Sequence, residues 1–341
     1  MDVVKFENLA VAGLACVDAP QMLTSQEIES MVSAAMERAG LPRGLIYQLT
    51  GIKARRLWEE GQMPSDAATL AGRAVLEQSG ISAAEVGLLI STSVSKDFVE
   101  PSVASLVHRN LGLGSRALNF DVGNACLGFL NGIQIAGEMI ERGHVEVAMV
   151  VAGESSREVL ESTMRRFNEP NYSTLEMRKQ LATLTLGSGS AAILLGPADR
   201  FADSPRITGC VTRAATEHNE LCRGQRTWME TDAANLLLRG VELGQKTFEA
   251  ASTHLGWSPE NLDAVAAHQV SAVHIARIAE ALGLGAEKFK KIYGDYGNVG
   301  PASIPIALDL LFQDPSLSKG SRIAMMGIGS GLNCSMMELV L

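Results

Sequence analysis

The chain has 341 residues, 46% of them hydrophobic and 20% charged, and therefore enough apolar surface for a large core and one to three domains. Its formal net charge is −9, and its longest basic runs are pairs of Lys or Arg residues. A nucleic-acid-binding face is therefore not expected. The N-terminus lacks the basic start and cleavage site of a signal peptide, and no apolar run reaches the roughly 18 residues of a membrane span. A soluble cytoplasmic protein is expected.

The five cysteines are widely and irregularly spaced, without a Cys-x-x-Cys pair. This pattern supports neither a zinc site nor a disulfide framework, and reduced thiols fit a cytoplasmic location. No metal and no bound cofactor are expected. The cysteines are Cys16, Cys126, Cys210, Cys222 and Cys334.

Short apolar strands alternate with apolar-periodic helices along the first half of the chain. Strands are expected over residues 9–17, 86–92, 117–122 and 145–152, and helices over residues 25–39, 65–78, 102–111 and 129–141. The first helix begins at a capping box in which Thr24 is the N-cap and Glu27 reaches back to it. This alternation predicts an α/β fold with a doubly wound sheet and helices on both faces.

The second half of the sequence repeats the order of elements of the first. The sequence Leu-Gly-Leu-Gly ends a helical segment in both halves, at residues 111–114 and 282–285. A glycine- and asparagine-containing turn precedes an apolar helix in both halves, at residues 123–128 and 294–300. The remaining elements expected in the second half are strands over 264–267 and 322–326 and helices over 273–285 and 304–311. Such a duplication predicts two equivalent halves related by a pseudo-two-fold axis.

This duplication divides the chain into an N-terminal half, residues 1–200, and a C-terminal half, residues 201–341. Residues 155–183 fit neither half, because they are polar, helical in pattern and interrupted by Pro170. A helical excursion from the N-terminal half is therefore expected over residues 155–183.

Cys126 is the best candidate nucleophile. It lies in Asp121-Val-Gly-Asn-Ala-Cys-Leu-Gly-Phe129, between an expected strand and an expected helix. The N-terminus of a helix lowers the pKa of a thiol and favours the thiolate, and the flanking glycines permit a strained turn. Most free cysteines are small buried apolar residues, and this interpretation is kept for the other four.

His268 and Asn298 are the candidate partners of Cys126. His268 follows the apolar residues 264–267 and so sits at the C-terminal end of a strand, where ligands gather in open α/β sheets; a histidine that only fills the interior is equally expected there. Asn298 precedes the apolar helix of the second half, as Cys126 precedes that of the first. An asparagine that only shapes a turn is the ordinary alternative, but the duplication places the two turns face to face.

Three motifs carry a resemblance to a known family. The segments Asn124-Ala-Cys-Leu-Gly-Phe129, His268-Gln-Val-Ser271 and Gly297-Asn-Val-Gly-Pro-Ala-Ser-Ile-Pro305 resemble the Cys-His-Asn set of the ketoacyl-acyl-carrier-protein synthase III branch of the thiolase superfamily. The resemblance covers essentially the whole chain. Within this branch the chain resembles the OleA-type enzymes, which condense two acyl-CoA molecules head to head in bacterial olefin biosynthesis. It implies a thiolase fold with two duplicated βαβαβαββ halves in a five-layered αβαβα core.

The resemblance also implies a role for each candidate residue. Cys126 would attack the first acyl-CoA, and the backbone N–H groups of Cys126 and Ser330 would bind the oxyanion. His268 and Asn298 would bind the carbonyl of the second acyl-CoA as it enolises.

The residues that contact CoA are less clear from the motifs. Arg55 and Arg56 are candidates for contacts to its pantetheine or phosphates, and surface charge is an equally good interpretation of both. Leu45 and Leu49 stand where synthase III relatives place an aromatic and a basic residue for CoA, which puts this assignment in doubt.

Glu100 separates two family interpretations. A synthase III creates its carbanion by decarboxylating a malonyl group, whereas joining two plain acyl thioesters requires a base at Cα. The resemblance implies a homodimer in which Glu100 reaches into the partner's active site as that base, with a pKa raised by its apolar neighbours. From the residues alone, Glu100 beside Pro101 would be a solvated surface glutamate.

The leading interpretation is therefore a non-decarboxylative Claisen condensation of two long-chain acyl-CoA thioesters to a 2-alkyl-3-keto acid. The alternative is a decarboxylative 3-oxoacyl synthase III-like enzyme that uses a malonyl thioester. A catalytically inactive partner subunit is a third hypothesis, disfavoured because Cys126, His268 and Asn298 are all present. A downstream enzyme of olefin biosynthesis is a candidate partner.

Overall fold

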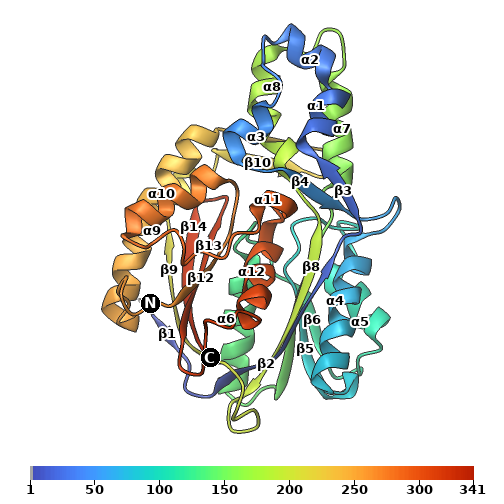
Figure 1. The fold of residues 1–341 in the computed structure, drawn as a ribbon. Coiled ribbons are helices and arrows are strands. Elements are labelled where there is room, and N and C mark those ends of the chain that lie inside the picture. The colour runs from blue at the N-terminus through green and yellow to red at the C-terminus, as the bar shows by residue number, and fades with distance from the viewer. Residues whose placement is uncertain (1–2) are drawn as a thin grey trace.

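Two sheet layers alternate with three helix layers in the computed structural model, which describes residues 3–341 (Figure 1). Nine strands form a hydrogen-bonded path in the order β12-β13-β14-β9-β2-β8-β7-β5-β6, and β1 pairs with β9. The two sheet layers meet where Ala10 of β2 pairs with Arg206 of β9. The ten strands are β1 (Val4–Lys5), β2 (Leu9–Asp18), β5 (Val86–Ser91), β6 (Leu118–Asp121), β7 (Val147–Glu154), β8 (Gly189–Pro197), β9 (Arg206–Ala214), β12 (Ala264–Ala267), β13 (Arg322–Gly329) and β14 (Asn333–Val340).

The strand order is duplicated between the halves. In the first half the order across the sheet is β6-β5-β7-β8-β2, and in the second it is β12-β13-β14-β9. Phe289 adds an isolated parallel bridge to Val265 of β12, at the place that β6 occupies beside β5. Each strand of the first half therefore has a counterpart in the second, and the chain visits the counterparts in the same order. The boundary at residue 200 stays a prediction.

The helices occupy three layers around the two sheets. Helices α6 and α12 pack between the sheets, α4 and α5 cover the outer face of the first, and α9 and α10 cover that of the second. Their bounds are α4 Pro64–Ser79, α5 Val103–Leu111, α6 Gly128–Glu141, α9 Ala233–Leu255, α10 Ala272–Leu282 and α12 Ser303–Phe312. This five-layered, duplicated arrangement is the thiolase fold expected from the sequence.

The composition of α6 explains its central place. Five apolar residues of α6 are 5% exposed or less: Phe129, Leu130, Ile133, Ala136 and Ile140. Buried apolar side chains therefore project from much of the circumference of this helix. A helix of this kind is stable only when it is covered on several sides. Because α6 is held between two sheets, the position of the turn at its N-terminus, which carries Cys126, is fixed as well.

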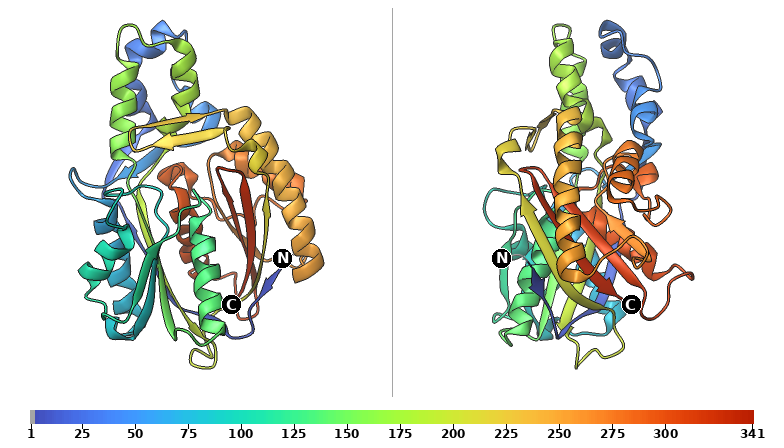
Figure 2. Two further views of the ribbon diagram at one scale, coloured as in Figure 1. Left: turned by 180° about the vertical axis from the view of Figure 1, so that it is seen from behind. Right: turned by 90° about the vertical axis from the view of Figure 1, so that its left-hand side faces the viewer.

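A smaller helical unit projects from the five layers (Figures 1 and 2). This unit consists of helices from near the N-terminus and helices from the excursion over residues 155–183, which is helical as expected. The two sets of helices share an apolar cluster that includes Ile28, Met36, Leu160 and Phe167. Its helices are α1 (Ser25–Met31), α2 (Ser33–Arg38), α3 (Leu45–Thr50), α7 (Arg157–Phe167) and α8 (Thr174–Gln180). At its base lie two two-stranded antiparallel sheets: β3 (Gln21–Thr24) with β4 (Ala54–Leu57), and the hairpin of β10 (Cys222–Gln225) with β11 (Trp228–Thr231).

Two expected elements differ from the structure. The single helix over 25–39 is wrong, because the chain breaks at Val32 (φ −116°, ψ 21°) into α1 and α2. The capping box at its start is confirmed: Thr24 Oγ1 accepts from the Glu27 N–H at 3.1 Å, and Glu27 Oε2 accepts from the Thr24 N–H at 2.7 Å. The turn over 294–300 begins with a short helix, α11 (Tyr293–Tyr296). Within residues 3–341, no helix is both long and apolar enough to cross a membrane.

Candidate active site

The turn that carries Cys126 is strained. Ala125 has a φ of 46° and is the one non-glycine residue with a positive φ among residues 3–341. A left-handed conformation is unfavourable for alanine because of its Cβ, and such strain concentrates at functional sites. Helix α6 begins two residues after Cys126. The backbone is therefore forced into a conformation that presents Cys126 just before the first turn of the helix.

The pKa of Cys126 is not lowered, contrary to the expectation from the helix N-terminus. Burial, with smaller effects of the nearby Glu154 carboxylate and Cys222 thiol, raises the pKa of this thiol to about 12. The dipole of a helix terminus is typically worth about 0.3–1 kcal/mol, whereas burial alone can shift a pKa by about 3–5 units. The resting Cys126 side chain is therefore the protonated thiol.

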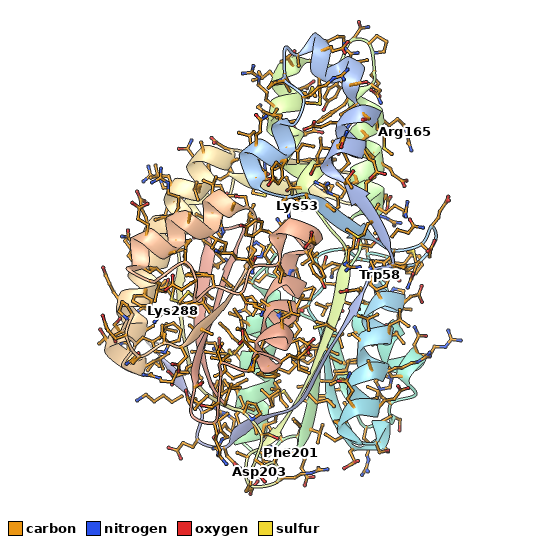
Figure 3. All side chains as sticks on the ribbon, viewed as in Figure 1. Lys53, Trp58, Arg165, Phe201, Asp203 and Lys288 are labelled. Carbon is orange, nitrogen blue, oxygen red and sulfur yellow. The ribbon has the colours of Figure 1, made fainter. Side chains whose placement is uncertain are left out.

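Glu154 belongs to the site, although the sequence analysis does not include it. It ends β7, and its carboxylate accepts hydrogen bonds from the Val94 N–H (2.8 Å), the Ser95 N–H (3.2 Å) and the Ser95 hydroxyl (2.9 Å). Trp58, labelled in Figure 3, donates its indole N–H to the Glu154 carbonyl at 2.9 Å. Burial raises the pKa of Glu154 to about 7, against the opposing effect of these hydrogen bonds. The carboxylate therefore changes charge near neutral pH, close to Cys126.

Replacing Glu154 should make Cys126 more reactive. Near pH 9 Glu154 is ionised, and its negative charge opposes formation of the Cys126 thiolate. Glu154→Gln is therefore expected to speed alkylation of Cys126 by iodoacetamide at that pH by about tenfold, the effect of one nearby charge on a pKa. The rate is measured by peptide mass spectrometry, with Glu161→Gln, an exposed carboxylate of α7, as the matched control. Equal rates in both variants would show that the charge of Glu154 does not reach the thiol.

His268 lies at the C-terminal end of β12, as expected, and is 3% exposed. Its backbone N–H donates to the Met326 carbonyl at 2.8 Å, which fixes it to β13. Burial and the neighbouring His274 lower the pKa of His268 to about 3, and a contact with the backbone of Gly300 acts in the opposite direction. His268 is therefore neutral at pH 7, so one ring nitrogen can donate a hydrogen bond and the other can accept one.

His274 is a half-buried histidine beside His268. The two ring centroids are 6.4 Å apart, and burial lowers the pKa of His274 to about 4. Both rings line a cavity of about 30 Å³ between α9, α10 and β13, which is room for a single water molecule. His274 lies one helical turn into α10, where the sequence offers no sign of its approach to His268.

Asn298 is held in place by its backbone. Its N–H donates to the Thr185 carbonyl (2.9 Å), and its carbonyl accepts from the Gly187 N–H (2.9 Å). The preceding Gly297 has a φ of 68°, and a Cβ there would lie 2.5 Å from the Thr185 oxygen, so only glycine fits. The side-chain oxygen of Asn298 accepts from the Gly300 N–H at 3.0 Å. Its amide N–H₂ remains available to a ligand, and Gly300 links it to His268.

Ser330 lies in the turn between β13 and β14, which packs on the Cys126 turn. A Cβ on Gly329 would lie 2.8 Å from the Asn124 carbonyl oxygen, and the Asn333 side chain donates to Asn124 Oδ1 at 3.2 Å. These contacts place the backbone around Ser330 against the residues that precede Cys126. Gly300, which bonds to Asn298 and contacts His268, lies against Glu154, since a Cβ on it would be 3.7 Å from the carboxyl carbon, and Glu154 acts on the Cys126 thiol. These contacts bring Cys126, His268, Asn298 and Ser330 into one region, together with Glu154.

Glu100 lies apart from these residues. It is exposed at the tip of the loop between β5 and α5, where Phe98 is 53% and Val99 99% exposed. Its side chain makes no hydrogen bond or ion pair within residues 3–341. The expected apolar surroundings of Glu100 are therefore not supplied by its own subunit, and its neighbours Phe98 and Val99 present apolar surface to the outside.

Arg55 and Arg56 are not free surface cations. Arg55 is 0% exposed and donates to the Leu23 carbonyl (3.2 Å) and the Ser25 hydroxyl (3.1 Å), and burial lowers its pKa to about 10. Because Arg55 is buried, it is poorly placed to contact CoA, and it is not a surface charge. Arg56 pairs with Asp18 at 3.2 Å and lies 5.0 Å from the ring centroid of Tyr296.

Comparison with known proteins adds to this geometry. Residues 120–208 match the 3-oxoacyl-[acyl-carrier-protein (ACP)] synthase III family, and residues 253–339 match its C-terminal domain. The acyl-CoA:acyl-CoA alkyltransferase of Xanthomonas campestris pv. campestris is 48% identical over 98% of this chain and 99% of its own. The chain belongs to the acyl-CoA:acyl-CoA alkyltransferase family. A relative of the same name from Shewanella oneidensis is 33% identical over 98% of this chain and 99% of its own.

Solved structures of a family member agree in fold. Cerulenin-bound OleA from Xanthomonas campestris has a TM-score of 0.97 to this chain at 47% identity, covering 99% of this chain and 98% of that one. A cysteine-to-serine variant of that alkyltransferase was solved with lauric acid and lauroyl-CoA, also with a TM-score of 0.97 and 47% identity, covering 98% of this chain and 100% of that one. Other solved variants substitute a glutamate, the same cysteine and a histidine. These positions are spaced along that chain as Glu100, Cys126 and His268 are here.

Proposed function

We propose that this protein condenses two long-chain acyl-CoA thioesters head to head, without decarboxylation, to a 2-alkyl-3-keto acid. The observation that carries the proposal is the gathering of Cys126, His268 and Asn298 at one site in a chain of the alkyltransferase family. The activity for which its relatives are named, acyl-CoA:acyl-CoA alkyltransferase, supports the choice of substrate. A cytoplasmic location and hand-over of the product to a downstream enzyme belong to the same proposal.

In the first step Cys126 takes the acyl group of one acyl-CoA. Its sulfur bonds to the carbonyl carbon while the backbone N–H groups of Cys126 and Ser330 bind the oxyanion. The carbon–sulfur bond to CoA then breaks, and CoA leaves as the thiol with the proton that Cys126 loses. Because the pKa of Cys126 is raised, this proton stays on the sulfur until the attack begins.

In the second step a base removes a Cα proton from the other acyl-CoA. Neutral His268 and the amide of Asn298 donate hydrogen bonds to its carbonyl oxygen as that oxygen gains charge. The carbanion attacks the acyl carbonyl on Cys126, the new carbon–carbon bond forms, and the thioester bond to Cys126 breaks. Hydrolysis of the remaining CoA thioester yields the keto acid.

His268→Ala and Asn298→Ala are expected to slow the second step more than the first. Backbone donors serve acylation of Cys126, whereas these two side chains serve the enolate, and one such donor is worth about 10²–10³ in rate. Rapid-quench mass spectrometry separates acylation from condensation in a single turnover. A loss of acylation as large as the loss of overall turnover would contradict this division of roles.

The base is Glu100 of the partner subunit in a homodimer. The exposed tip that carries Glu100, with Phe98 and Val99 beside it, supports this arrangement, because such apolar surface is normally covered by a partner. Burial at the dimer interface would also supply the apolar surroundings expected of a carboxylate base.

Mixing two inactive chains tests whether Glu100 acts in the active site of the partner subunit. A Cys126→Ala chain and a Glu100→Ala chain, carrying different tags, are co-expressed and the heterodimer is purified through both tags. One of its two sites then has both groups, so condensation is expected at about half the rate of the wild-type dimer. Absence of activity in the verified heterodimer would show that Glu100 acts within its own chain or does not act.

One incubation tests the proposed function as a whole. Purified protein is mixed with a long-chain acyl-CoA alone, and free CoA and keto acid are measured by absorbance and mass spectrometry. Release of two CoA molecules for each keto acid is the expected result. A requirement for a malonyl thioester, with release of CO₂, would overturn the proposal in favour of a decarboxylative synthase.

A further inference from the structure

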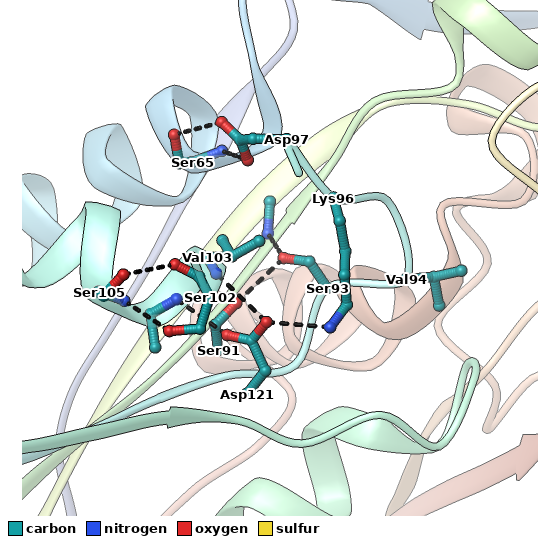
Figure 4. A network of polar contacts seen from close by, with 12 residues as sticks. Ser65, Ser91, Ser93, Val94, Lys96, Asp97, Ser102, Val103, Ser105 and Asp121 are labelled. Atoms are coloured by element: carbon teal, nitrogen blue, oxygen red, sulfur yellow. Dashed lines mark hydrogen bonds and ion pairs between the residues drawn. The ribbon is translucent and has the colours of Figure 1, made fainter. Parts of the chain in front are cut away.

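The loop that carries Glu100 is fixed at both ends, and only its tip is free. It runs from Ser93, after β5, to Ser102, before α5, and its tip is Phe98-Val-Glu-Pro101. Figure 4 shows the polar contacts that hold it. A catalytic group on a loop acts efficiently only when the loop is preorganised, so the residues that fix these ends bear on the base itself.

Asp121 connects the two ends of this loop. Before the tip, Lys96 Nζ lies 3.0 Å from Asp121 Oδ2. After the tip, the N–H groups of Val103 and Ala104, in the first turn of α5, donate to the same carboxylate at 3.2 and 2.9 Å. One carboxylate thus closes the loop at its base (Figure 4).

A second carboxylate fixes the residue directly before the tip. Asp97 is 2% exposed, and it accepts from the Ser65 N–H at 3.0 Å and from the Ser65 hydroxyl at 2.6 Å. The Asp97 carbonyl accepts from Arg226 at 3.1 Å. Asp97 therefore anchors the loop to the start of α4, while Asp121 sets the spacing between its two ends.

Asp121 also ends β6, five residues before Cys126 in the same segment. The residue that closes the Glu100 loop is therefore part of the strand that leads to the nucleophile of its own subunit. We propose that Asp121 is a positioning residue for Glu100, because its contacts to Lys96 and to the start of α5 hold the tip in the geometry in which it serves Cys126 of the partner subunit. This inference rests on the proposed function, in which Glu100 is the base.

Asp121→Asn is the test variant, because it keeps the size of the side chain but removes the charge that pairs with Lys96. It is expected to acylate Cys126 as the wild type does and to slow condensation by about 10²-fold, the usual effect of a misplacement near 1 Å. Asp314→Asn is the matched control: Asp314 likewise pairs with a lysine, Lys290 at 3.6 Å, and accepts from a backbone N–H, that of Ser316 at 3.1 Å, in the C-terminal half of the chain. Its condensation rate should equal that of the wild type.

Heterodimers show which site Asp121 serves. When an Asp121→Asn chain is paired with a Cys126→Ala chain, the remaining Cys126 depends on the unchanged Glu100 loop of the Cys126→Ala chain. Normal condensation is then expected. When both substitutions are on one chain and the other chain is wild type, the remaining Cys126 depends on the Glu100 loop of the Asp121→Asn chain. Slow condensation is then expected. The reverse pattern would show that Asp121 acts on its own Cys126 turn and would overturn the inference, as would normal rates in both.

The same pair of heterodimers with Glu100→Ala in place of Asp121→Asn keeps the two proposals apart. If Glu100→Ala slows condensation at Cys126 of the partner subunit and Asp121→Asn does not, the proposed function stands and this inference fails. If the Glu100 defect follows its own chain, the exchange of Glu100 between subunits is wrong, and the positioning role fails with it.

Discussion

Cys126→Ala is expected to abolish acylation of the protein by acyl-CoA and, with it, all condensation. A methyl group cannot form a thioester, and Cys126→Ser should be nearly as inactive, because a hydroxyl is a poor nucleophile without a dedicated base. Intact-mass measurement of wild-type protein treated with an acyl-CoA should show one added acyl group per chain. Both variants should show none.

The other thiols provide the control for this experiment. Cys222 lies in the β10–β11 hairpin, is partly accessible and is close enough to raise the pKa of Cys126. Cys222→Ala should therefore still accept one acyl group, and peptide mapping should place that group on Cys126. An acyl group found on Cys222 or Cys210 in the wild-type protein would refute the assignment of the nucleophile.

The architecture was largely predictable because short apolar strands and periodic helices alternate with clear boundaries. The strands expected over 86–92 and 264–267 and the helices over 65–78 and 129–141 correspond to β5, β12, α4 and α6 within one or two residues. Strands β8, β9 and β14 and the long helix α9 were not anticipated. A continuous apolar run such as 191–195 fits a buried strand or a buried helix equally well. Only the strands that pair with this run in the folded protein determine that it is a strand.

The places of the candidate residues in the fold were predictable where the duplication marked them, whereas the pKa shifts that burial causes were not. Cys126 and Asn298 occupy equivalent turns, and His268 ends a recognisable strand. Glu154 also ends a strand, and its carboxylate, one glycine after the apolar residues 147–152, was a usable signal, since polar groups at strand ends often line sites. The raised pKa of Cys126 could not be read from its motif, because it depends on side chains far away in the sequence that cover the turn.

Glu100→Ala is expected to leave acylation of Cys126 nearly unchanged and to slow condensation of two acyl-CoA molecules by roughly two to four orders of magnitude, the usual effect of losing a positioned general base. Thioester exchange onto Cys126 needs no base at Cα, so the two steps should separate cleanly. Single-turnover mass spectrometry measures both. Glu60→Ala, at another exposed glutamate, is the matched control and should change neither step.

Glu100→Asp should recover only part of the lost rate, because shortening the side chain by one methylene moves the carboxylate away from Cα. Exchange of the Cα proton of a bound acyl-CoA with deuterium from the solvent reports on the base directly, and it should disappear in Glu100→Ala. If the wild type uses a malonyl thioester far better than a plain acyl-CoA, and Glu100→Ala alters neither rate, Glu100 is an ordinary surface residue. The carbanion would then arise from loss of CO₂, and the site built around Cys126, His268 and Asn298 would be that of a decarboxylative synthase.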